Sequence, residues 1–243
     1  MSTVEVCGLC KTYPAFRLED VSFDIREGRI AGFIGRNGAG KTTTIKMLCG
    51  LTKATSGDAF LNGKSIKTDL AAVKTVIGVS PQETAVAPGL TVKENLELMC
   101  GVHGIGKEKR AGKISELTER LGLNTVLGKK AGKLSGGWQR RLSIAMALIG
   151  EPEILFLDEP TLGLDVLARS DLWELIRALK GKITIILTTH YMEEAEKLSD
   201  RIAVMKDGKL LFCGTAGEIK QTAGTDSFEE AFVRIVKGEL QCE

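Results

Sequence analysis

The sequence predicts an α/β protein with a buried, largely parallel sheet, an antiparallel β-rich part near the N-terminus and an inserted helical part. Residues 30–34, 154–157 and 183–187 are short, mostly apolar runs, which are typical of strands buried on both faces. Within residues 3–34, short segments alternate with period two, as antiparallel strands with one buried face do. From about residue 90 to residue 150 the apolar spacing becomes helical instead.

Composition limits the classes of function. The 243 residues suffice for one large domain or two intimate subdomains with a sizeable core. A net charge of +2 produces no field that would attract nucleic acid, and the basic run 107–113 is expected to be a solvated helix or loop. No apolar run is long enough to span a bilayer and no signal peptide begins the chain, so we expect another chain to supply any membrane contact.

Six cysteines lie at positions 7, 10, 49, 100, 213 and 242. Only Cys7 and Cys10 have the close spacing of a redox or zinc motif, and neither a second pair nor a histidine cluster completes such a site. Because Cys7 ends an apolar alternating segment, we expect it to pack as a small buried residue. Free cysteines favour a reducing, cytoplasmic setting.

A glycine-rich stretch between a buried strand and a helix carries the strongest functional signal. Gly35 and Gly40 are separated by four residues, Gly38 lies between them, and Lys41 and Thr42 follow. This pattern is typical of a loop whose backbone N–H groups surround phosphate oxygens at the positive end of a helix. The lysine would contact the β- and γ-phosphates and the threonine hydroxyl would bind Mg²⁺, so the sequence predicts binding of a nucleoside triphosphate.

Two adjacent carboxylates end another buried strand. Asp158 and Glu159 follow the apolar residues 154–157, where unpaired acids would be costly unless they served a metal or a reaction. If this strand lies beside the phosphate-loop strand, Asp158 is close to the Mg²⁺ bound by Thr42. Glu159 would then face the γ-phosphate, where it can orient and deprotonate a water molecule.

Two further polar residues follow strand ends. His190 comes after the strand 183–187 and can hydrogen-bond the γ-phosphate or the attacking water. Gln82 follows the strand 76–80, at the edge of an open α/β sheet where ligands bind. By itself, the glutamine is a weak signal.

Two other features are ambiguous from the residues alone. Tyr13, upstream of the phosphate loop, could stack on an adenine ring or could be a half-buried core residue, and the two are equally favoured. Ser135, Gly136 and Gly137 precede a helix, where Ser135 is expected to act as N-cap. The exposed N–H groups of the two glycines suit an anion, but from these residues alone an ordinary capped helix is the better explanation.

The remaining elements follow from periodicity and turn residues. Glu27-Gly28 predicts a hairpin turn, and Asn62-Gly63 and Asp207-Gly208 predict further turns. The predicted helices span residues 43–49, 139–149, 166–180, 192–198 and 228–237, and the other strands span residues 4–6, 21–25, 57–61, 76–80, 201–206 and 209–213.

Taken together, these motifs resemble the ATP-binding cassette (ABC) family over essentially the whole chain. Residues 35–42 match the Walker A loop and residues 154–158 match Walker B. Glu159 matches the catalytic glutamate, Gln82 the Q-loop and His190 the switch histidine. The other matches are Leu134 to Gly137 with the signature motif, Leu164-Asp165 with the D-loop, and Tyr13 with an aromatic residue that stacks on adenine.

The resemblance implies a P-loop NTPase fold with a RecA-like core, an N-terminal antiparallel β-subdomain and an inserted α-helical subdomain. It implies one domain over residues 1–243, with the core in 1–83 and 151–218, the helical subdomain in 84–150 and a C-terminal helical tail in 219–243. It also implies ATP and Mg²⁺ as cofactors, with Thr42, Gln82 and Asp158 as metal ligands and Glu159, His190 and Gln82 as catalytic residues. The implied nucleotide contacts are Tyr13, Gly35, Arg36, Asn37, Gly38, Ala39, Gly40, Lys41, Thr42, Thr43, Ser135, Gly136 and Gly137.

The family resemblance further implies an ATPase subunit that dimerises around two ATP molecules and drives a membrane transporter. Its expected partners are a separate permease chain and a second, identical ATPase subunit, with no nucleic acid. The expected location is cytoplasmic, peripheral on the inner face of the cell membrane. Residues 89–96 and 227–232 resemble exporter subunits, whose substrate contacts lie in the permease.

One residue departs from the family pattern, and two other classes of function compete. Trp138 replaces the glutamine that usually ends the signature, which affects local packing there. A soluble cassette ATPase acting on ribosomes or DNA is the alternative, although such relatives usually carry two cassettes or a long coiled-coil insertion. A kinase or GTPase would not account for Leu134 to Gly137, and the base-reading motif of GTPases is absent from the sequence.

Overall fold

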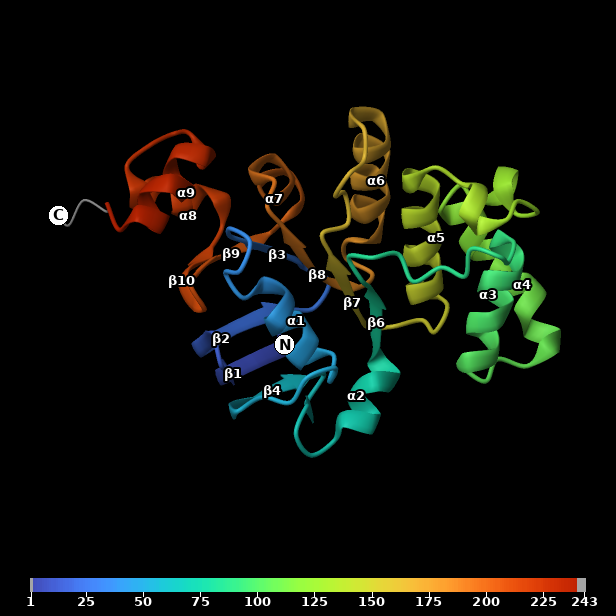
Figure 1. Ribbon diagram of the computed structural model, residues 1–243, viewed down its shortest axis with the longest axis horizontal. Coiled ribbons are helices and arrows are strands. Elements are labelled where there is room, and N and C mark those ends of the chain that lie inside the picture. Colours follow the sequence, from blue (N-terminus) through green and yellow to red (C-terminus); the bar gives the residue numbers. More distant parts are fainter. Residues whose placement is uncertain (1, 240–243) are drawn as a thin grey trace.

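The computed structural model describes residues 2–239 and contains two sheets (Figure 1). The four-stranded antiparallel sheet has the order β2-β1-β4-β5, and the six-stranded sheet has the order β10-β9-β3-β8-β7-β6. In the larger sheet all neighbouring strands pair in parallel except β10, which pairs antiparallel with β9. The predicted α/β class and the antiparallel N-terminal part are therefore confirmed.

The strands are β1 (Ser2–Tyr13), β2 (Phe16–Arg26), β3 (Ile30–Ile34), β4 (Ser56–Leu61), β5 (Lys64–Ser65), β6 (Ile77–Ser80), β7 (Ile154–Asp158), β8 (Thr184–Thr189), β9 (Arg201–Lys206) and β10 (Lys209–Gly214). The α-helices are α1 (Lys41–Leu48), α2 (Leu70–Val76), α3 (Val92–Val102), α4 (Lys107–Arg120), α5 (Gly136–Leu148), α6 (Val166–Leu179), α7 (Met192–Leu198), α8 (Ala216–Ala223) and α9 (Phe228–Lys237). Short 3₁₀ turns cover Asn124–Val126 and Ala131–Lys133.

The larger sheet is covered on both faces, which explains its apolar strands. Alternate residues of β7 face different clusters: Ile154 and Phe156 pack with α1 and the antiparallel sheet, whereas Leu155 and Leu157 pack with α5 and α6. A strand with two buried faces has no polar side, so its sequence does not alternate.

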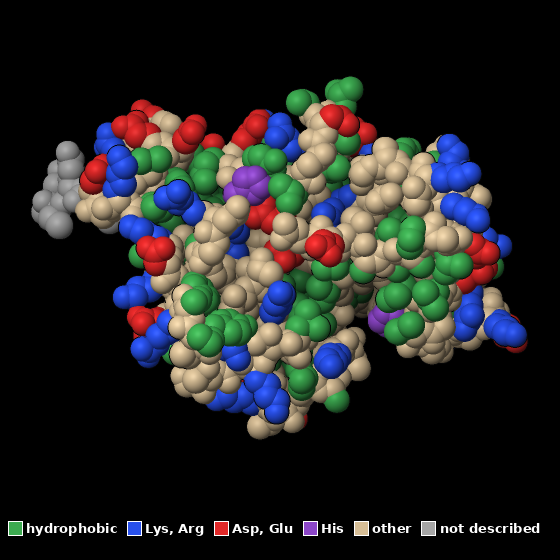
Figure 2. All heavy atoms as spheres, in the orientation of Figure 1, with side chains coloured by type: hydrophobic (Ala, Val, Ile, Leu, Met, Phe, Trp, Pro, Cys, Tyr) green, Lys and Arg blue, Asp and Glu red, His purple; other side chains and the backbone are tan. Residues whose placement is uncertain are grey.

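The helical part lies at one end of the molecule, at the opposite end from α8 and α9 (Figure 1). Its helices share the hydrophobic cluster that covers one face of the larger sheet. The basic run 107–113 forms the first two turns of α4 and is mostly exposed, as predicted. Side chains of both signs lie over the visible face of the molecule (Figure 2), in keeping with the small net charge.

The prediction of a hairpin at Glu27-Gly28 is wrong. The chain instead turns between Tyr13 and Phe16, which pair across the end of the β1–β2 hairpin. Residues 27 and 28 lead from β2 in one sheet to β3 in the other. The turn chemistry at Gly28 is as expected, with φ of +68°, but turn chemistry does not determine which strands pair.

The expected burial of Cys7 is also wrong. Val4 and Val6 of β1 point into the core, so Cys7 in the next position of the pleat is exposed. Cys10 is half-buried, and its Sγ accepts a hydrogen bond from the Asp20 amide at 3.3 Å. Within residues 2–239, no three His, Cys, Asp or Glu side chains gather as metal ligands.

The C-terminal helices complete the core at the other end of the larger sheet. Phe228 and Phe232 of α9 and Ile219 of α8 pack with Ile34 and Ile202 of the sheet. The predicted helix 228–237 is confirmed, while α8 and α2 lack a clear signal in the sequence. None of the helices within residues 2–239 is both long enough and apolar enough to cross a bilayer.

Candidate functional site

The phosphate loop lies between β3 and α1, as predicted, but α1 begins at Lys41, two residues earlier than expected. Gly38 and Gly40 have φ of +84° and +109°, which side chains other than glycine rarely adopt. The Lys41 side chain folds back over the loop and donates to the Gly35 carbonyl at 2.7 Å. This conformation directs the first amide groups of α1 and a buried ammonium into one small region.

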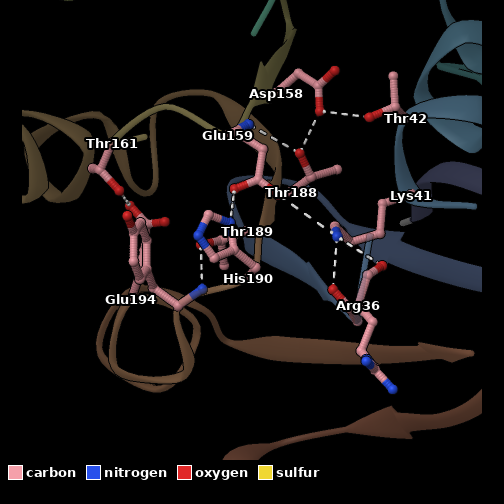
Figure 3. Close-up of polar contacts among 12 residues, drawn as sticks. Arg36, Lys41, Thr42, Asp158, Glu159, Thr161, Thr188, Thr189, His190 and Glu194 are labelled. Carbon is pink, nitrogen blue, oxygen red and sulfur yellow. Dashed lines mark hydrogen bonds and ion pairs between the residues drawn. The ribbon is translucent and has the colours of Figure 1, made fainter. Parts of the chain in front are cut away.

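Asp158, at the end of β7, contacts the first turn of α1. Its Oδ1 accepts hydrogen bonds from Thr42 Oγ1 at 3.1 Å and from Thr188 Oγ1 at 2.5 Å (Figure 3). The carboxylate is 6% exposed. A carboxylate and a hydroxyl are hard oxygen ligands of the kind that Mg²⁺ prefers, so these two side chains fit the predicted ion.

Glu159 lies between a lysine and a histidine. Its Oε1 is 3.6 Å from Lys41 Nζ, and its Oε2 is 2.8 Å from His190 Nδ1 (Figure 3). The residue has φ of +48°, an uncommon backbone conformation for a glutamate, and its N–H donates to the carbonyl oxygen of Thr188 at 3.1 Å. Local strain of this kind is retained where the surroundings fix a side chain for function.

A cavity of about 610 Å³ is lined by Lys41, Thr42, Glu159 and His190, whereas Asp158 is not part of its wall. Gln82 lies on its wall, as predicted, and is exposed. Tyr13 is not part of the wall; it lies at the end of β1, 38% exposed, with Lys11 Nζ 5.0 Å from its ring. The lining residues are Ala15, Phe16, Asn37, Gly38, Ala39, Gly40, Lys41, Thr42, Thr43, Gln82, Glu159, Leu162 and His190.

The signature residues lie outside this cavity. Ser135 occupies the N-cap position of α5, but its side chain makes no capping hydrogen bond, so the predicted capping role of its hydroxyl is wrong. Ser135 and Gly136 are both exposed. Trp138 packs against its own helical part, with the Arg141 guanidinium carbon 5.2 Å from the ring centre. Ser135, Gly136 and Gly137 are therefore not part of the wall of this cavity in their own chain.

Three polar residues near the site, Thr188, Arg140 and Glu194, were not predicted from the sequence as part of it. Thr188 bridges Asp158 and Glu159: its hydroxyl donates to Asp158 and accepts the N–H of Glu159 at 3.0 Å. Arg140 of α5 is 4% exposed, and Glu194 of α7 is fully buried. Thr188 and Glu194 could have been suspected as polar residues at a strand end and on a short helix, but nothing near Arg140 in the sequence distinguishes it from the neighbouring Arg141.

The fold and the site together define a class of protein. A P-loop lysine, an oxygen donor pair suited to Mg²⁺ and a carboxylate beside them are the parts that phosphoryl transfer from a nucleoside triphosphate requires. The family model described as "ABC transporter" matches residues 18–162. The chain belongs to the ABC transporter family, and it is an ATP-hydrolysing ATP-binding cassette with the P-loop NTPase fold.

Several curated proteins are similar in sequence. The chain is 40% identical over 238 residues to the doxorubicin resistance ATP-binding protein DrrA of Mycobacterium tuberculosis, covering 96% of this chain and 72% of that protein. It is 37% identical to the probable multidrug ABC transporter ATP-binding protein YbhF of Escherichia coli, covering 97% and 42%. It is 39% identical to the human phospholipid-transporting ATPase ABCA3, covering 85% and 12%. The chain thus spans less than half the length of the last two relatives.

Solved structures agree with this assignment. An ATP-binding subunit of an ABC transporter superimposes with a TM-score of 0.85 at 30% identity, covering 96% of this chain and 99% of that one. A dimeric ATP-binding cassette in a post-hydrolysis state, bound to ADP and Pi, superimposes with a TM-score of 0.79 at 27% identity, covering 87% and 98%.

Proposed function

We propose that this chain is the ATPase subunit of a membrane exporter, in which two copies close around two ATP molecules and drive a separate permease. The main support is one geometric observation: the phosphate cavity contains Lys41 and Glu159, whereas Ser135–Gly137 lie outside it, with Ser135 and Gly136 exposed. In this proposal Ser135–Gly137 complete the cavity of a second copy.

Within one site, the side chains have separate roles. Lys41 and the amide groups of residues 35–43 bind the β- and γ-phosphates. Thr42, Asp158 and Gln82 hold Mg²⁺, which when bound offsets negative charge on the phosphates. Arg36, Asn37 and Ala39 contribute backbone contacts, and Tyr13 stacks on the adenine.

Glu159 acts as the general base. Its Oε2 accepts the proton of the water that attacks the γ-phosphate, and His190, 2.8 Å away, orients the carboxylate and contacts the phosphate. Gln82 positions the same water from the other wall of the cavity. The buried setting of Glu159 keeps bulk water away from its charge and so strengthens these contacts.

The membrane role is supported by the relatives. DrrA and YbhF are described as doxorubicin resistance and multidrug proteins, which favours export by a separate permease on the inner face of the membrane, with this chain bound peripherally. None of the relatives named above is described as acting on ribosomes or DNA, so this alternative gains no support.

Substitution of Glu159 tests the proposal. Glu159→Gln keeps the size of the side chain but cannot accept the proton, which typically slows hydrolysis by about 10²–10⁴-fold. ATP then persists and stabilises the associated state, because in this proposal it binds the dimer more tightly than the separated subunits. Size-exclusion chromatography with Mg-ATP should show a dimer for this variant and a monomer without nucleotide.

The control is Glu174→Gln, an exposed carboxylate of α6 that is 71% exposed. It should hydrolyse ATP at the wild-type rate and should not form a lasting dimer. A Glu159→Gln protein that binds ATP and still elutes as a monomer at high concentration would show that Ser135–Gly137 do not contact a second copy's nucleotide.

A further inference from the structure

Arg140 joins the signature helix to the loop that carries Gln82. Its two terminal nitrogens donate to the carbonyl oxygens of Pro81 and Gln82, each at 2.6 Å. The residue is one turn into α5, whose first residue is Gly136. One guanidinium group therefore connects Gln82, on the wall of the nucleotide cavity, to the exposed start of α5.

This contact is unusual for a buried arginine. The side chain is 4% exposed, yet no carboxylate within residues 2–239 forms an ion pair with it. Burial lowers the pKa of the Arg140 guanidinium, with partial compensation from the more distant charges of Asp158 and Glu194. Burying a cation against carbonyl oxygens alone is costly, so a simple packing role would be served better by an apolar residue.

The packing of α5 on β6 does not need Arg140. Gly78 of β6 lies so close to Ala147 of α5 that an added Cβ would come within 2.3 Å of the Ala147 carbonyl oxygen. One turn closer to the start of α5, the hydroxyls of Ser80 and Ser143 are 2.8 Å apart. These two contacts hold the helix against the strand, whereas Arg140 contacts the chain beyond the strand end.

Gln82 has few other restraints. It is exposed, and within the described residues its side chain makes no hydrogen bond and its carbonyl accepts only from Arg140. The direction of the glutamine side chain therefore depends on the backbone that Arg140 holds.

We propose that Arg140 is a positioning residue that fixes Gln82 relative to Ser135–Gly137, and thereby couples the two ATP sites of the dimer. The coupling rests on the proposed function, in which Gln82 serves the nucleotide of its own chain and Ser135–Gly137 serve that of the partner. When the dimer closes and α5 contacts the partner's ATP, α5 shifts. The Arg140 guanidinium shifts with it and moves Gln82, because it is hydrogen-bonded to the carbonyl oxygens of Pro81 and Gln82.

Arg140→Lys tests the link, since a lysine keeps the charge but its single ammonium cannot reproduce the two-pronged contact. The ATP affinity of the variant, measured by calorimetry, should stay within about twofold of wild type, because Lys41 and the phosphate loop are untouched. The value of kcat should fall about tenfold or more, as expected when a positioning contact is lost, and the Hill coefficient for ATP should fall towards 1. Amide hydrogens of residues 82–84 should exchange about tenfold faster without nucleotide.

Arg110→Lys is the matched control. Arg110 also donates to a backbone carbonyl, that of Ile105 at 2.8 Å, in the same helical part but away from Gln82. This variant should match wild type in kcat, Hill coefficient and exchange at residues 82–84. Wild-type exchange and wild-type kcat in Arg140→Lys would overturn the proposal.

Ser143→Ala supplies an independent test if Arg140→Lys does not fold. The substitution removes the Ser80–Ser143 hydrogen bond between α5 and β6 and leaves the Arg140 contact in place, so by this proposal exchange at residues 82–84 and kcat remain at the wild-type level. A tenfold change in either would mean that general packing positions Gln82, which would overturn the role of Arg140.

Failure of the proposed dimer would give a different result. The wild-type protein would then lack cooperativity and ATP-dependent dimers, while the exchange measurement would still report on the Arg140 contact.

Discussion

At the scale of single residues, Lys41 has two roles in the unliganded site. Its ammonium is 6% exposed, donates to the Gly35 carbonyl at 2.7 Å and lies 3.6 Å from Glu159. It therefore offsets the charge of a buried carboxylate, and in the proposed function phosphate oxygens replace this contact when ATP binds. A buried ammonium is costly unless it is paired with a negative or polar group. Lys41 therefore needs such a partner both before and after ATP binds.

Lys41→Ala should therefore abolish ATP hydrolysis and weaken Mg-ATP binding by about 10- to 100-fold, the range expected for one lost charge-assisted hydrogen bond. Calorimetry measures the affinity, and circular dichroism checks that the fold is kept. Lys46→Ala on the exposed side of the same helix is the control and should bind ATP normally. Unchanged affinity in Lys41→Ala would contradict the phosphate-loop assignment.

Glu194 is a second buried carboxyl whose environment sets its protonation. Thr161 Oγ1 and Trp173 Nε1 donate to its Oε1 at 2.9 Å and 3.0 Å, and its Oε2 has no partner within the described residues. Burial raises the pKa of Glu194 above its ordinary value of 4.5, and the nearby charge of Glu159 adds to the shift. The contribution of protonated Glu194 to the free energy of unfolding is therefore complete below pH 4.5, and it is lost as the pH rises through the raised pKa.

Glu194→Gln should remove this pH dependence, because a glutamine can accept the same two hydrogen bonds and does not ionise. The melting temperature of the variant relative to wild type should rise as the pH increases from 4.5 through the raised pKa of Glu194. Thermal unfolding in a series of buffers measures the difference. Parallel curves for the two proteins over that range would show that Glu194 does not titrate in the folded state there.

At the scale of elements, the contact of α5 with β6 depends on a residue without a side chain. Gly78→Ala would place a Cβ 2.3 Å from the Ala147 carbonyl oxygen, so α5 has to move outward. Overpacking of this kind typically costs about 1–3 kcal/mol, which corresponds to a melting temperature lower by about 2–12 °C in a protein of this size.

Gly112→Ala is the informative comparison for that prediction. Gly112 lies inside α4, and an added Cβ would meet nothing within 4 Å. Alanine favours a helix interior over glycine by up to about 1 kcal/mol, so this variant should melt slightly higher than wild type. If both variants shifted in the same direction, the close approach of α5 to β6 would not be the cause.

At the scale of the whole molecule, a separate hydrophobic cluster joins the C-terminal helices to the strand that precedes the phosphate loop. Phe228 is 4% exposed and belongs to the same cluster as Ile34, the last residue of β3. Helix α9 thus packs beneath the strand that leads into the phosphate loop, although it contains none of the site motifs.

Phe228→Ala should lower the free energy of unfolding by about 3–5 kcal/mol, the usual cost of truncating a buried phenylalanine. Urea unfolding monitored by circular dichroism measures it. Val233→Ala, on the same helix but 39% exposed, should cost far less. A cost of Phe228→Ala as small as that expected for Val233→Ala would mean that Phe228 contributes little to the core.

Local patterns were enough to predict much of the fold and of the site. The phosphate loop could be identified because its glycines, lysine and threonine act through the backbone of a few consecutive residues. Apolar strands and amphipathic helices such as α6, α7 and α9 could be located because burial on one or two faces leaves a period in the sequence. The role of Asp158 was predictable only on the assumption that β7 lies near β3.

The sequence by itself determined the class of chemistry, since the phosphate-binding loop and the paired acids are local patterns. Tertiary structure alone decided which of these groups meet. The Thr42–Asp158 contact joins residues 116 positions apart. The strand β7 is not the neighbour of β3, because β8 lies between them, and the contact forms because α1 packs against β7. The exposure of Cys7, the unused hydroxyl of Ser135 and the burial of Arg140 were decided in the same way. These three outcomes depend on how the strands pleat and how the helices pack. The contacts involved join residues that are far apart in the sequence, so no short stretch of sequence determines their free energy.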